Sequence, residues 1–279
     1  MSRLYCPTYL CLKEWRQLIN IQDKLFKVEL PTLLHVLCSI PPLKDMVTQE
    51  HLGEYQNIIN EIFVTAPRAV MEENMKKDFT ILYPAHENIY VNVTNRCPFN
   101  CTFCLRQSMD SVYGNEKSLW LTKEPSVEEV IDAFKQRDIS SYKEIVFCGF
   151  GEPTERLYDI FEICDYLKQN YDKPIRINTN GMANLIWNKD TTKDFKNRID
   201  IVSVSLNHPD KNKYQKLVRS KFGIKTHEAM LEFVKEVKKY VSKVVLTTVD
   251  TTLSKEEEKL CQKICDELQV EYRIRPYEE

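Results

Sequence analysis

Six short apolar segments rich in β-branched residues recur from about residue 88 to the end of the chain, separated by helix-like stretches. The predicted strands are 89–94, 145–149, 175–180, 201–205, 244–249 and 271–275. Strands that alternate with helices form parallel βαβ units with right-handed crossovers, which restricts this region to an α/β fold. The alternation alone is compatible with an open sheet and with a barrel-like curl.

Two of the separating stretches begin with the same local signal. Ser126 precedes VEEVIDAFKQ and Glu129 follows three residues later, and Ser254 and Glu257 repeat this arrangement near the end of the chain. A serine followed three residues later by glutamate predicts a capping box at a helix start. Apolar residues at helical spacing predict two further helices, over 155–170 and 227–241.

The strand pattern also decides between the two arrangements of the sheet. Buried parallel strands are normally apolar on both faces. Here one alternating face, continued just past the strand ends, is polar, and its members are Asn92, Thr94, Arg176, Asn178, Asn180, Ser203, Ser205, Asn207, Arg273 and Arg275. Such residues either hydrogen-bond to one another or line a wet interior that holds a ligand. The number of polar positions favours the second interpretation and therefore a partial (β/α)6 TIM-like barrel.

Residues 1–85 do not follow this alternation. They predict a mostly helical N-terminal extension with breaks at Pro31, Pro41–Pro42 and Pro67, so that the expected domains are 1–85 and 86–279. The extension could cap the open end of the barrel, bind a partner or supply part of a pocket. Its apolar stripes need a surface to cover, which favours capping.

Composition excludes several classes of protein. The formal net charge of −2 argues against a dedicated nucleic-acid-binding surface. No run of 18 apolar residues predicts a membrane span, and the N-terminus lacks the features of a secretory signal. Ten cysteines without such a signal indicate thiols in a reducing compartment, so a cytoplasmic location is expected.

Three of the ten cysteines follow the first predicted strand as Cys-x3-Cys-x2-Cys, namely Cys97, Cys101 and Cys104. A structural zinc site needs a fourth ligand, and a zinc deaminase needs a His-x-Glu signature that the chain lacks. Three thiolates on a four-iron cluster instead leave one iron open for a ligand. Phe103 would add a flat apolar surface beside that cluster. The alternatives for these three cysteines are zinc and three thiols without metal. A second cluster could in addition be built from Cys6, Cys11 and Cys38.

CPFNCTFC resembles the cluster motif of the radical S-adenosylmethionine (radical SAM) superfamily, in which an aromatic residue precedes the last cysteine. The resemblance implies a [4Fe–4S] cluster whose open iron is chelated by the amino and carboxylate groups of S-adenosylmethionine. One-electron reduction then yields methionine and a 5′-deoxyadenosyl radical that abstracts a substrate hydrogen. It also implies a one-electron donor such as a flavodoxin or ferredoxin.

Other motifs agree with this resemblance. GFGEP, with Phe150 in place of a glycine, is similar to the superfamily's Gly-Gly-Glu-Pro element, and VSVSLN is similar to its fourth-strand element. The resemblance implies cofactor contacts from Gly149, Phe150, Gly151, Glu152, Asn180, Ser203, Ser205 and Asn207. The fifth strand, VVLTTVD, lacks the glycine-containing motif that packs on adenine, so the adenine contacts are not assigned.

Within the superfamily, several motifs in the same order resemble the TatD-associated radical SAM proteins over about residues 88–277. They are CTFCLRQ, LWLTKEPSVEEVI, EIVFCGFGEPTERL, RINTNGMANLI, DIVSVSLNHPDKNKY and YRIRPY. This narrower resemblance names no reaction, because the family is named for its association with a nuclease-type hydrolase family.

The substrate is not specified by these motifs, and a small molecule, a nucleoside and a polypeptide all stay open. Candidate substrate-facing residues are Arg106, Gln107, Trp120, Arg176, Arg273 and Arg275. Each arginine could equally form a surface salt bridge. The leading hypothesis is a radical SAM enzyme. The alternatives are an activase of a glycyl-radical enzyme and a noncatalytic iron–sulfur or zinc protein that senses redox state or contacts RNA.

Overall fold

A computed structural model describes residues 80–112, 114 and 117–276 of the 279-residue chain. The strands of this part are β1 (Leu82–Ala85), β2 (Asn88–Val91), β3 (Ile145–Phe147), β4 (Ile175–Thr179), β5 (Ile201–Ser205), β6 (Lys243–Val249) and β7 (Glu271–Arg275). Its α-helices are α6 (Val127–Lys135), α7 (Leu157–Asn170), α8 (Ala183–Trp187), α9 (Lys211–Val218), α10 (Thr226–Val237) and α11 (Lys255–Leu268). Short 3-10 helices are η1 (Leu105–Gln107), η2 (Pro153–Arg156), η3 (Thr192–Phe195) and η4 (Gly223–Lys225). The predicted helical extension lies almost entirely outside the described residues.

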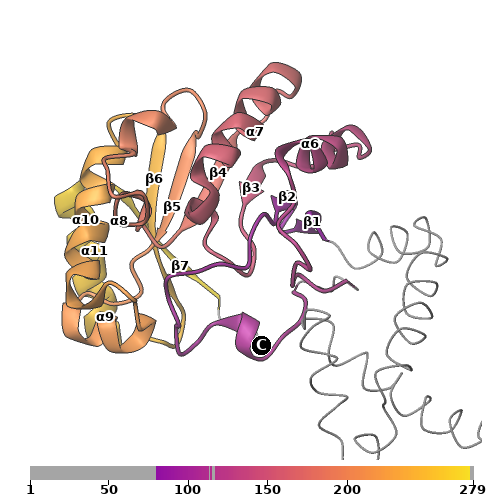
Figure 1. Ribbon diagram of the computed structural model, residues 1–279. Helices are drawn as coiled ribbons and strands as arrows, with labels where there is room; N and C mark the ends of the chain where they lie inside the picture. Colours follow the sequence, from indigo (N-terminus) through magenta and orange to yellow (C-terminus); the bar gives the residue numbers. More distant parts are fainter. Residues whose placement is uncertain (1–79, 113, 115–116, 277–279) are drawn as a thin grey trace, which may run out of the picture. The chain divides into compact units, whose positions relative to one another are not determined.

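The sheet has the order β1-β2-β3-β4-β5-β6-β7, in which every strand pairs with its neighbour along the chain (Figure 1). Strands β2 to β7 are parallel, and β1 is antiparallel to β2. A doubly wound sheet must reverse its strand order, whereas sequential order with right-handed crossovers keeps all helices on one face. The six parallel strands therefore form the predicted partial barrel, which is confirmed.

Strand β1 is a feature that the sequence pattern did not indicate. Leu82–Ala85 pairs with Asn88–Val91 across a two-residue turn, although residues up to 85 were assigned to the helical extension. The turn residues His86 and Glu87 have φ angles of 45° and 63°. Positive φ at both central positions is the requirement of a type I′ hairpin turn, which is usually met by Asn-Gly or Asp-Gly. The missing glycine hid the hairpin, and the sheet begins at Leu82, ahead of the first predicted strand at residue 89.

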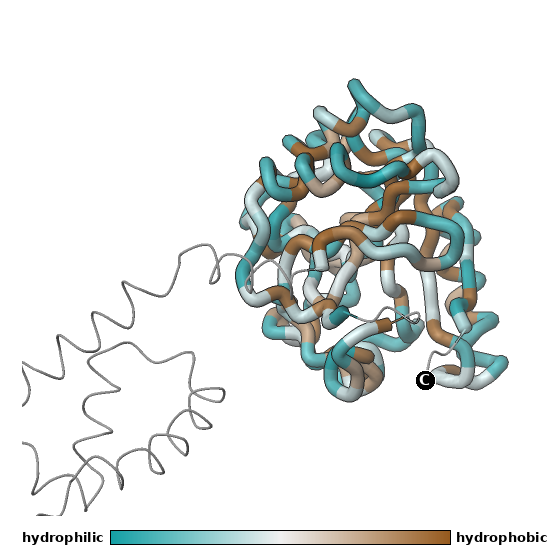
Figure 2. Tube along the Cα trace, turned by 90° about the vertical axis from the view of Figure 1, so that its right-hand side faces the viewer, coloured by the Kyte–Doolittle hydropathy of each residue, from teal (hydrophilic) through white to brown (hydrophobic). Residues whose placement is uncertain are grey.

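The two faces of the sheet differ as the alternation predicted. Asn178 pairs with Ser203, and Ser205 pairs with Thr247, which pairs with Arg273, so these polar residues share one face. The other face carries the apolar core that packs beneath the helices, with fully buried members such as Ile145, Phe147, Ile177, Val202, Val204 and Leu246. Figure 2 shows the hydrophilic segments concentrated at the periphery of this part of the chain. We refer to the polar face as the inner face.

The inner face is not polar throughout. A second apolar cluster covers its β1–β3 side and consists of Tyr83, Ala85, Tyr90, Val112, Leu119, Val146 and Phe150. Two of these residues, Val112 and Leu119, come from the loop between β2 and α6, which folds back over the strands. The polar part of the inner face is therefore narrower than the sequence suggested and lies toward β4–β7.

Helix starts follow the local signals. Both predicted capping boxes are present, at Ser126 with Glu129 and at Ser254 with Glu257. Helices α8 and α9 were not predicted. Helix α8 has five residues, and α9 is mostly polar, with only Tyr214 and Val218 buried, so neither shows a clear helical period. No helix in the described part of the chain is long and apolar enough to span a membrane.

Candidate cluster and cofactor site

The three cysteines lie on one loop, which leaves the carboxyl end of β2 and ends at η1. We call residues 92–104 the cysteine loop. Cys97, Cys101 and Cys104 are all half-buried, and Cys104 is the residue that precedes η1. The backbone N–H of Cys104 donates to the carbonyl of Cys101 at 3.3 Å, and that of Gln107 donates to the carbonyl of Cys104 at 3.0 Å. The last two cysteines are thus fixed in a tight turn.

The cysteine loop is hydrogen-bonded to α9, the helix that follows β5. The N–H of Asn100 donates to the carbonyl of Val218 at 3.0 Å, and the N–H of Thr102 donates to the carbonyl of Leu217 at 2.9 Å. These carbonyls belong to the last turn of α9, where no further helical N–H is available to them. Unsatisfied carbonyls at the helix end therefore hold the middle of the loop.

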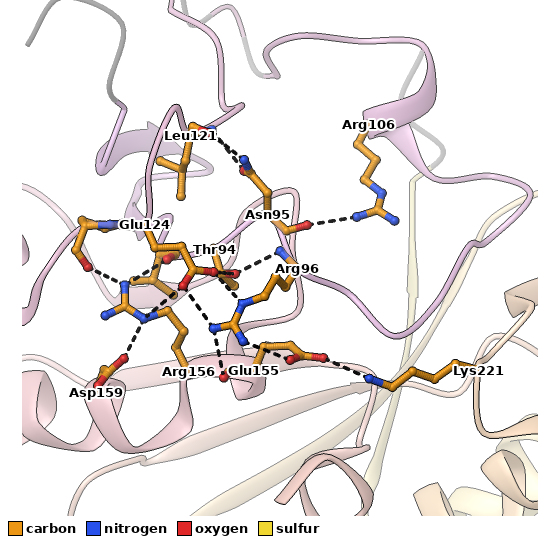
Figure 3. A network of polar contacts seen from close by, with 12 residues as sticks. Thr94, Asn95, Arg96, Arg106, Leu121, Glu124, Glu155, Arg156, Asp159 and Lys221 are labelled. Atoms are coloured by element: carbon orange, nitrogen blue, oxygen red, sulfur yellow. Dashed lines mark hydrogen bonds and ion pairs between the residues drawn. The ribbon is translucent and has the colours of Figure 1, made fainter. Parts of the chain in front are cut away.

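Arg106 connects the two ends of the same loop. Its guanidinium donates to the carbonyls of Asn95 at 3.3 Å and Phe99 at 3.1 Å. Asn95 in turn exchanges two hydrogen bonds with the backbone of Leu121, at 2.7 and 3.0 Å (Figure 3). Arg106 was a candidate for substrate contact, but these donors are committed to the loop that carries the cysteines.

A charged network fixes the start of the loop. Arg96 forms an ion pair with Glu124 at 2.7 Å, and Glu124 also accepts a hydrogen bond from Thr94 (Figure 3). Arg156, which is buried, donates to the carbonyl of Val93 at 3.1 Å and pairs with Asp159 at 2.6 Å. Arg96 is exposed, so its pair contributes less than the buried contacts of Arg156. Arg96, Glu124 and Arg156 were not selected from the sequence, because the partners in this network are up to 63 residues away.

We expect Arg106→Gln to loosen the cysteine loop without removing a metal ligand. Hydrogen bonds from a charged donor contribute about 1.5–3 kcal/mol each, so losing two, about 3–6 kcal/mol in all, should raise local opening of the loop by roughly 100- to 10,000-fold. Hydrogen exchange at the amides of residues 97–104 measures this opening. Arg137→Gln is the matched control, because Arg137 donates to the Leu82 carbonyl and the Tyr142 hydroxyl instead. Equal exchange in both variants would contradict the assignment.

The thiols are in surroundings that disfavour their charged form. Burial raises the pKa of Cys97 to about 12, and the nearby Glu152 carboxylate acts in the same direction. Burial, with Cys104 and Cys97, likewise raises the pKa of Cys101 to about 12. The Arg106 guanidinium opposes both shifts. A thiolate in such a place requires a strong positive charge next to it, which a bound metal centre supplies.

The donor set of three thiols on one loop is compatible with an iron–sulfur cluster. Among residues 80–112, 114 and 117–276, no three His, Cys, Asp or Glu side chains converge to hold one metal ion. A four-iron cluster accepts each thiolate on a different iron, so its ligands need not converge on one point. Three half-buried thiols spread along one fixed loop meet that requirement.

Gly149 and Gly151 allow β3 and the cysteine loop to approach each other. A Cβ atom on Gly149 would lie 2.1 Å from the side-chain oxygen of Asn92. A Cβ atom on Gly151 would lie 2.3 Å from the carbonyl oxygen of Thr94 and 2.7 Å from that of Arg96. These positions need glycine because no side chain fits, not because of an unusual φ angle.

Glu152 links three segments of the site. Its carboxylate accepts hydrogen bonds from Thr154 N–H at 3.1 Å, Thr154 O–H at 2.7 Å, Thr179 O–H at 2.6 Å and Asn180 N–H at 2.8 Å. Its own N–H donates to the carbonyl of Arg96 at 2.7 Å. Burial raises the pKa of Glu152, while the four donors favour the charged form. The side chain therefore joins β4 to the loop after β3, a role that the sequence alone did not indicate.

The ends of β4 and β5 present buried amide groups without partners. Asn180 accepts from the N–H of Met182 at 2.9 Å, but its side-chain nitrogen has no hydrogen-bond partner within the described chain. Asn207, whose φ is 56°, has a buried side-chain oxygen that likewise has no hydrogen-bond partner within the described chain. Unsatisfied buried polar atoms are costly unless a ligand completes them. Both residues were predicted cofactor contacts, and one free donor with one free acceptor suits a polar cofactor.

The remaining predicted contacts divide into two groups. Ser203, which is buried, and Ser205, which is half-buried, lie on the inner face of β5. Phe150 instead packs into the apolar cluster, with the ring of Trp120 edge-on at 5.2 Å. Phe103 is half-buried on the cysteine loop. The structure thus places Gly149, Gly151, Glu152 and the start of the cysteine loop in direct contact, and it places the serines further along the sheet.

Comparisons with known proteins agree with this arrangement. The model of the radical SAM superfamily matches residues 91–264. Among solved structures, Streptococcus suis SuiB bound to S-adenosylmethionine is 18% identical with a TM-score of 0.52, covering 68% of this chain and 40% of SuiB. SuiB bound to the precursor peptide SuiA is 16% identical with a TM-score of 0.50, covering 68% and 39%.

A radical SAM methyltransferase from Sphaerobacter thermophilus is 16% identical with a TM-score of 0.46, covering 70% of this chain and 57% of that protein. The chain spans about two fifths of the length of SuiB, and likeness at this identity shows the fold alone. No curated protein sequence matches the chain significantly. The family match extends over more than half of the residues, so the chain belongs to the radical SAM superfamily, whose members are enzymes that use a [4Fe–4S] cluster and S-adenosylmethionine.

Proposed function

We propose that this chain is a radical SAM enzyme in which Cys97, Cys101 and Cys104 bind the [4Fe–4S] cluster. The observation that carries the proposal is the cysteine loop itself. Backbone bonds to α9 and the Arg106 bridge fix it at the carboxyl ends of the strands, where α/β folds place their ligands.

The surroundings of the loop support a place for S-adenosylmethionine beside it. Asn180 and Asn207 offer an unpaired buried nitrogen and an unpaired buried oxygen, and Ser203 and Ser205 continue the polar row along β5. Gly149 and Gly151 keep the loop after β3 close against the cysteine loop. When bound, the two cofactors supply one-electron cleavage of a carbon–sulfur bond, giving methionine and a 5′-deoxyadenosyl radical. The residues of the chain orient and shield that chemistry.

The proposal includes a one-electron donor, such as a flavodoxin or ferredoxin, and a substrate that supplies the abstracted hydrogen. The narrower resemblance to the TatD-associated proteins stays a prediction, as does the division into domains at residues 85 and 86. SuiB was crystallised with a precursor peptide. At 16% identity that partner assigns no substrate to this chain.

Anaerobic protein carrying about four irons, given a reductant and S-adenosylmethionine, is expected to release 5′-deoxyadenosine. Iron binding without this release would contradict the proposal and favour the noncatalytic iron–sulfur alternative. Zinc in place of iron after reconstitution would also contradict it. An activase would in addition transfer the radical to a glycine of a partner protein, which electron paramagnetic resonance detects.

A further inference from the structure

The inner face of the sheet carries three arginines on two strands that are not neighbours. Arg176 lies on β4, and Arg273 and Arg275 lie on β7. The strand register places them on the same face. Asn178, two residues after Arg176, pairs with Ser203 on β5. Ser205, two residues further along β5, pairs with Thr247 on β6, which pairs with Arg273. Side chains two residues apart on a strand share a face, so all three guanidiniums start from the inner face.

The curl of the sheet brings these side chains together. Arg273 is exposed, Arg275 is half-buried and Arg176 is buried, so the three side chains run from the interior to the surface. Partial desolvation lowers the pKa of Arg273, and the positive charges of Arg176 and Arg275 lower it further. Arg176 also hydrogen-bonds to Tyr90 on β2 and interacts electrostatically with Cys148 at the end of β3. Cys148 interacts with Arg275 in the same way. Residues of β2, β4 and β7 and of the end of β3 therefore contribute to one part of the inner face.

Positive charge in this region exceeds negative charge. Arg176 pairs with Glu144 at 3.0 Å, and that carboxylate is half-buried. Within the described part of the chain, neither Arg273 nor Arg275 forms an ion pair with a carboxylate. The Nε–H of Arg275 is buried and has no hydrogen-bond acceptor among the described residues. The side-chain oxygen of Asn178 is buried and has no donor there. Placing several positive charges close together without matching negative charges raises the free energy of the folded state, and a bound anion would lower it.

We propose that Arg273 and Arg275, with Arg176 behind them, bind an anionic group of the substrate, either a carboxylate or a phosphate. Guanidinium groups bind both of these groups through paired N–H donors. The inference rests on the proposed function, because it assigns the anion to the molecule that donates the hydrogen atom.

The position of the arginines suits such a substrate. Arg273 lies in the same row as Ser205, two strands away, and Ser205 is a predicted cofactor contact. An anion held at β7 would leave the rest of its molecule to extend across the inner face toward the cofactor. The apolar cluster on β1–β3 closes the other side of the interior, so the polar β4–β7 side is where an anionic molecule would lie.

Anion binding by the full chain carrying its cluster tests this proposal. Inorganic phosphate and succinate serve as separate probes in isothermal titration calorimetry at low ionic strength. Binding of at least one probe is expected, and the one that binds distinguishes a phosphorylated from a carboxylate substrate. Arg273→Gln and Arg275→Gln should each weaken it by roughly 10-fold or more, because a charged donor is lost. Arg198→Gln, which removes a surface pair with Asp165, should leave binding unchanged.

Two results would overturn the assignment: neither probe binds the wild-type chain, or all three variants bind equally. Release of 5′-deoxyadenosine without added substrate is measured in the same preparations. If it persists in the Gln variants, then they are folded and their loss of anion binding is specific. If wild-type protein binds an anion through these arginines but cleaves no S-adenosylmethionine, then the proposed function fails while the anion site stands.

Discussion

Replacing Cys97, Cys101 or Cys104 singly with alanine is expected to reduce release of 5′-deoxyadenosine below detection. Each substitution removes one of three thiolate ligands, and a cluster held by two thiolates is not retained in the required form. The loop should keep its position, because its attachment to α9 and to Arg106 uses backbone carbonyls and not the thiols. Iron per chain and the visible absorbance of the reconstituted protein measure the loss.

Cys265→Ala is the matched control for this experiment. Cys265 is fully buried in α11, and its thiol acts as a small apolar side chain there. The control should lose about 1 kcal/mol of stability through a small cavity and should keep both iron and cleavage activity. Full iron content and undiminished cleavage in any one of the three loop variants would show that its cysteine is not a ligand.

Gly151→Ala is expected to have the second largest effect. The new Cβ would meet two backbone carbonyl oxygens, of Thr94 at 2.3 Å and of Arg96 at 2.7 Å. Neither can move without moving the cysteine loop, so no side-chain rotation relieves the overlap. We expect a loss of about 3 kcal/mol in the free energy of unfolding, at the upper end of overpacking costs. Chemical denaturation measures it.

The same change should also impair the chemistry, since the hydrogen bond from Glu152 N–H to the Arg96 carbonyl crosses this contact. Displacement of about 1 Å in a catalytic arrangement can lower the rate by roughly 100-fold. Gly223→Ala is the control that distinguishes the effect of a steric clash from the effect of backbone strain on stability. Gly223 has a φ of 71°, and a Cβ atom there would meet no other atom within 4 Å, so only strain of about 1 kcal/mol is expected. Equal losses in the two variants would show that the close approach is unimportant.

The fold followed from local patterns to a considerable extent. The six parallel strands, both capping boxes and the polar inner face were predicted because each depends on residues close together in the sequence. The strand ends were predicted less well: β2 ends at Val91 and not at residue 94, and Asn92 beyond it donates from its side chain to the carbonyls of Thr80 and Leu119. The β1–β2 hairpin was missed because His86 and Glu87 adopt left-handed angles that usually identify glycine or asparagine.

The candidate site likewise has features that local sequence predicts and features that it does not. The spacing of the cysteines and the motif GFGEP predicted its principal residues from local sequence alone. Arg106 was a candidate for the substrate side, with a salt bridge as the alternative, and its donors instead bond to backbone carbonyls of the cysteine loop. Phe150 packs against Trp120 in an apolar cluster that the alternation of the strands did not predict. Such contacts depend on how a loop folds back, which no local pattern records.

The sequence by itself determined which chemistry the chain carries, because three thiols at fixed short spacing need only one loop to act together. It also determined the order of strands and helices, since hydrophobic period and caps are local. Only the tertiary structure decided why Gly149 and Gly151 are required and which charges gather in the interior. Arg176 and Arg273 are 97 positions apart, and only the curl of a sequentially ordered sheet, with its helices all on one face, brings them together.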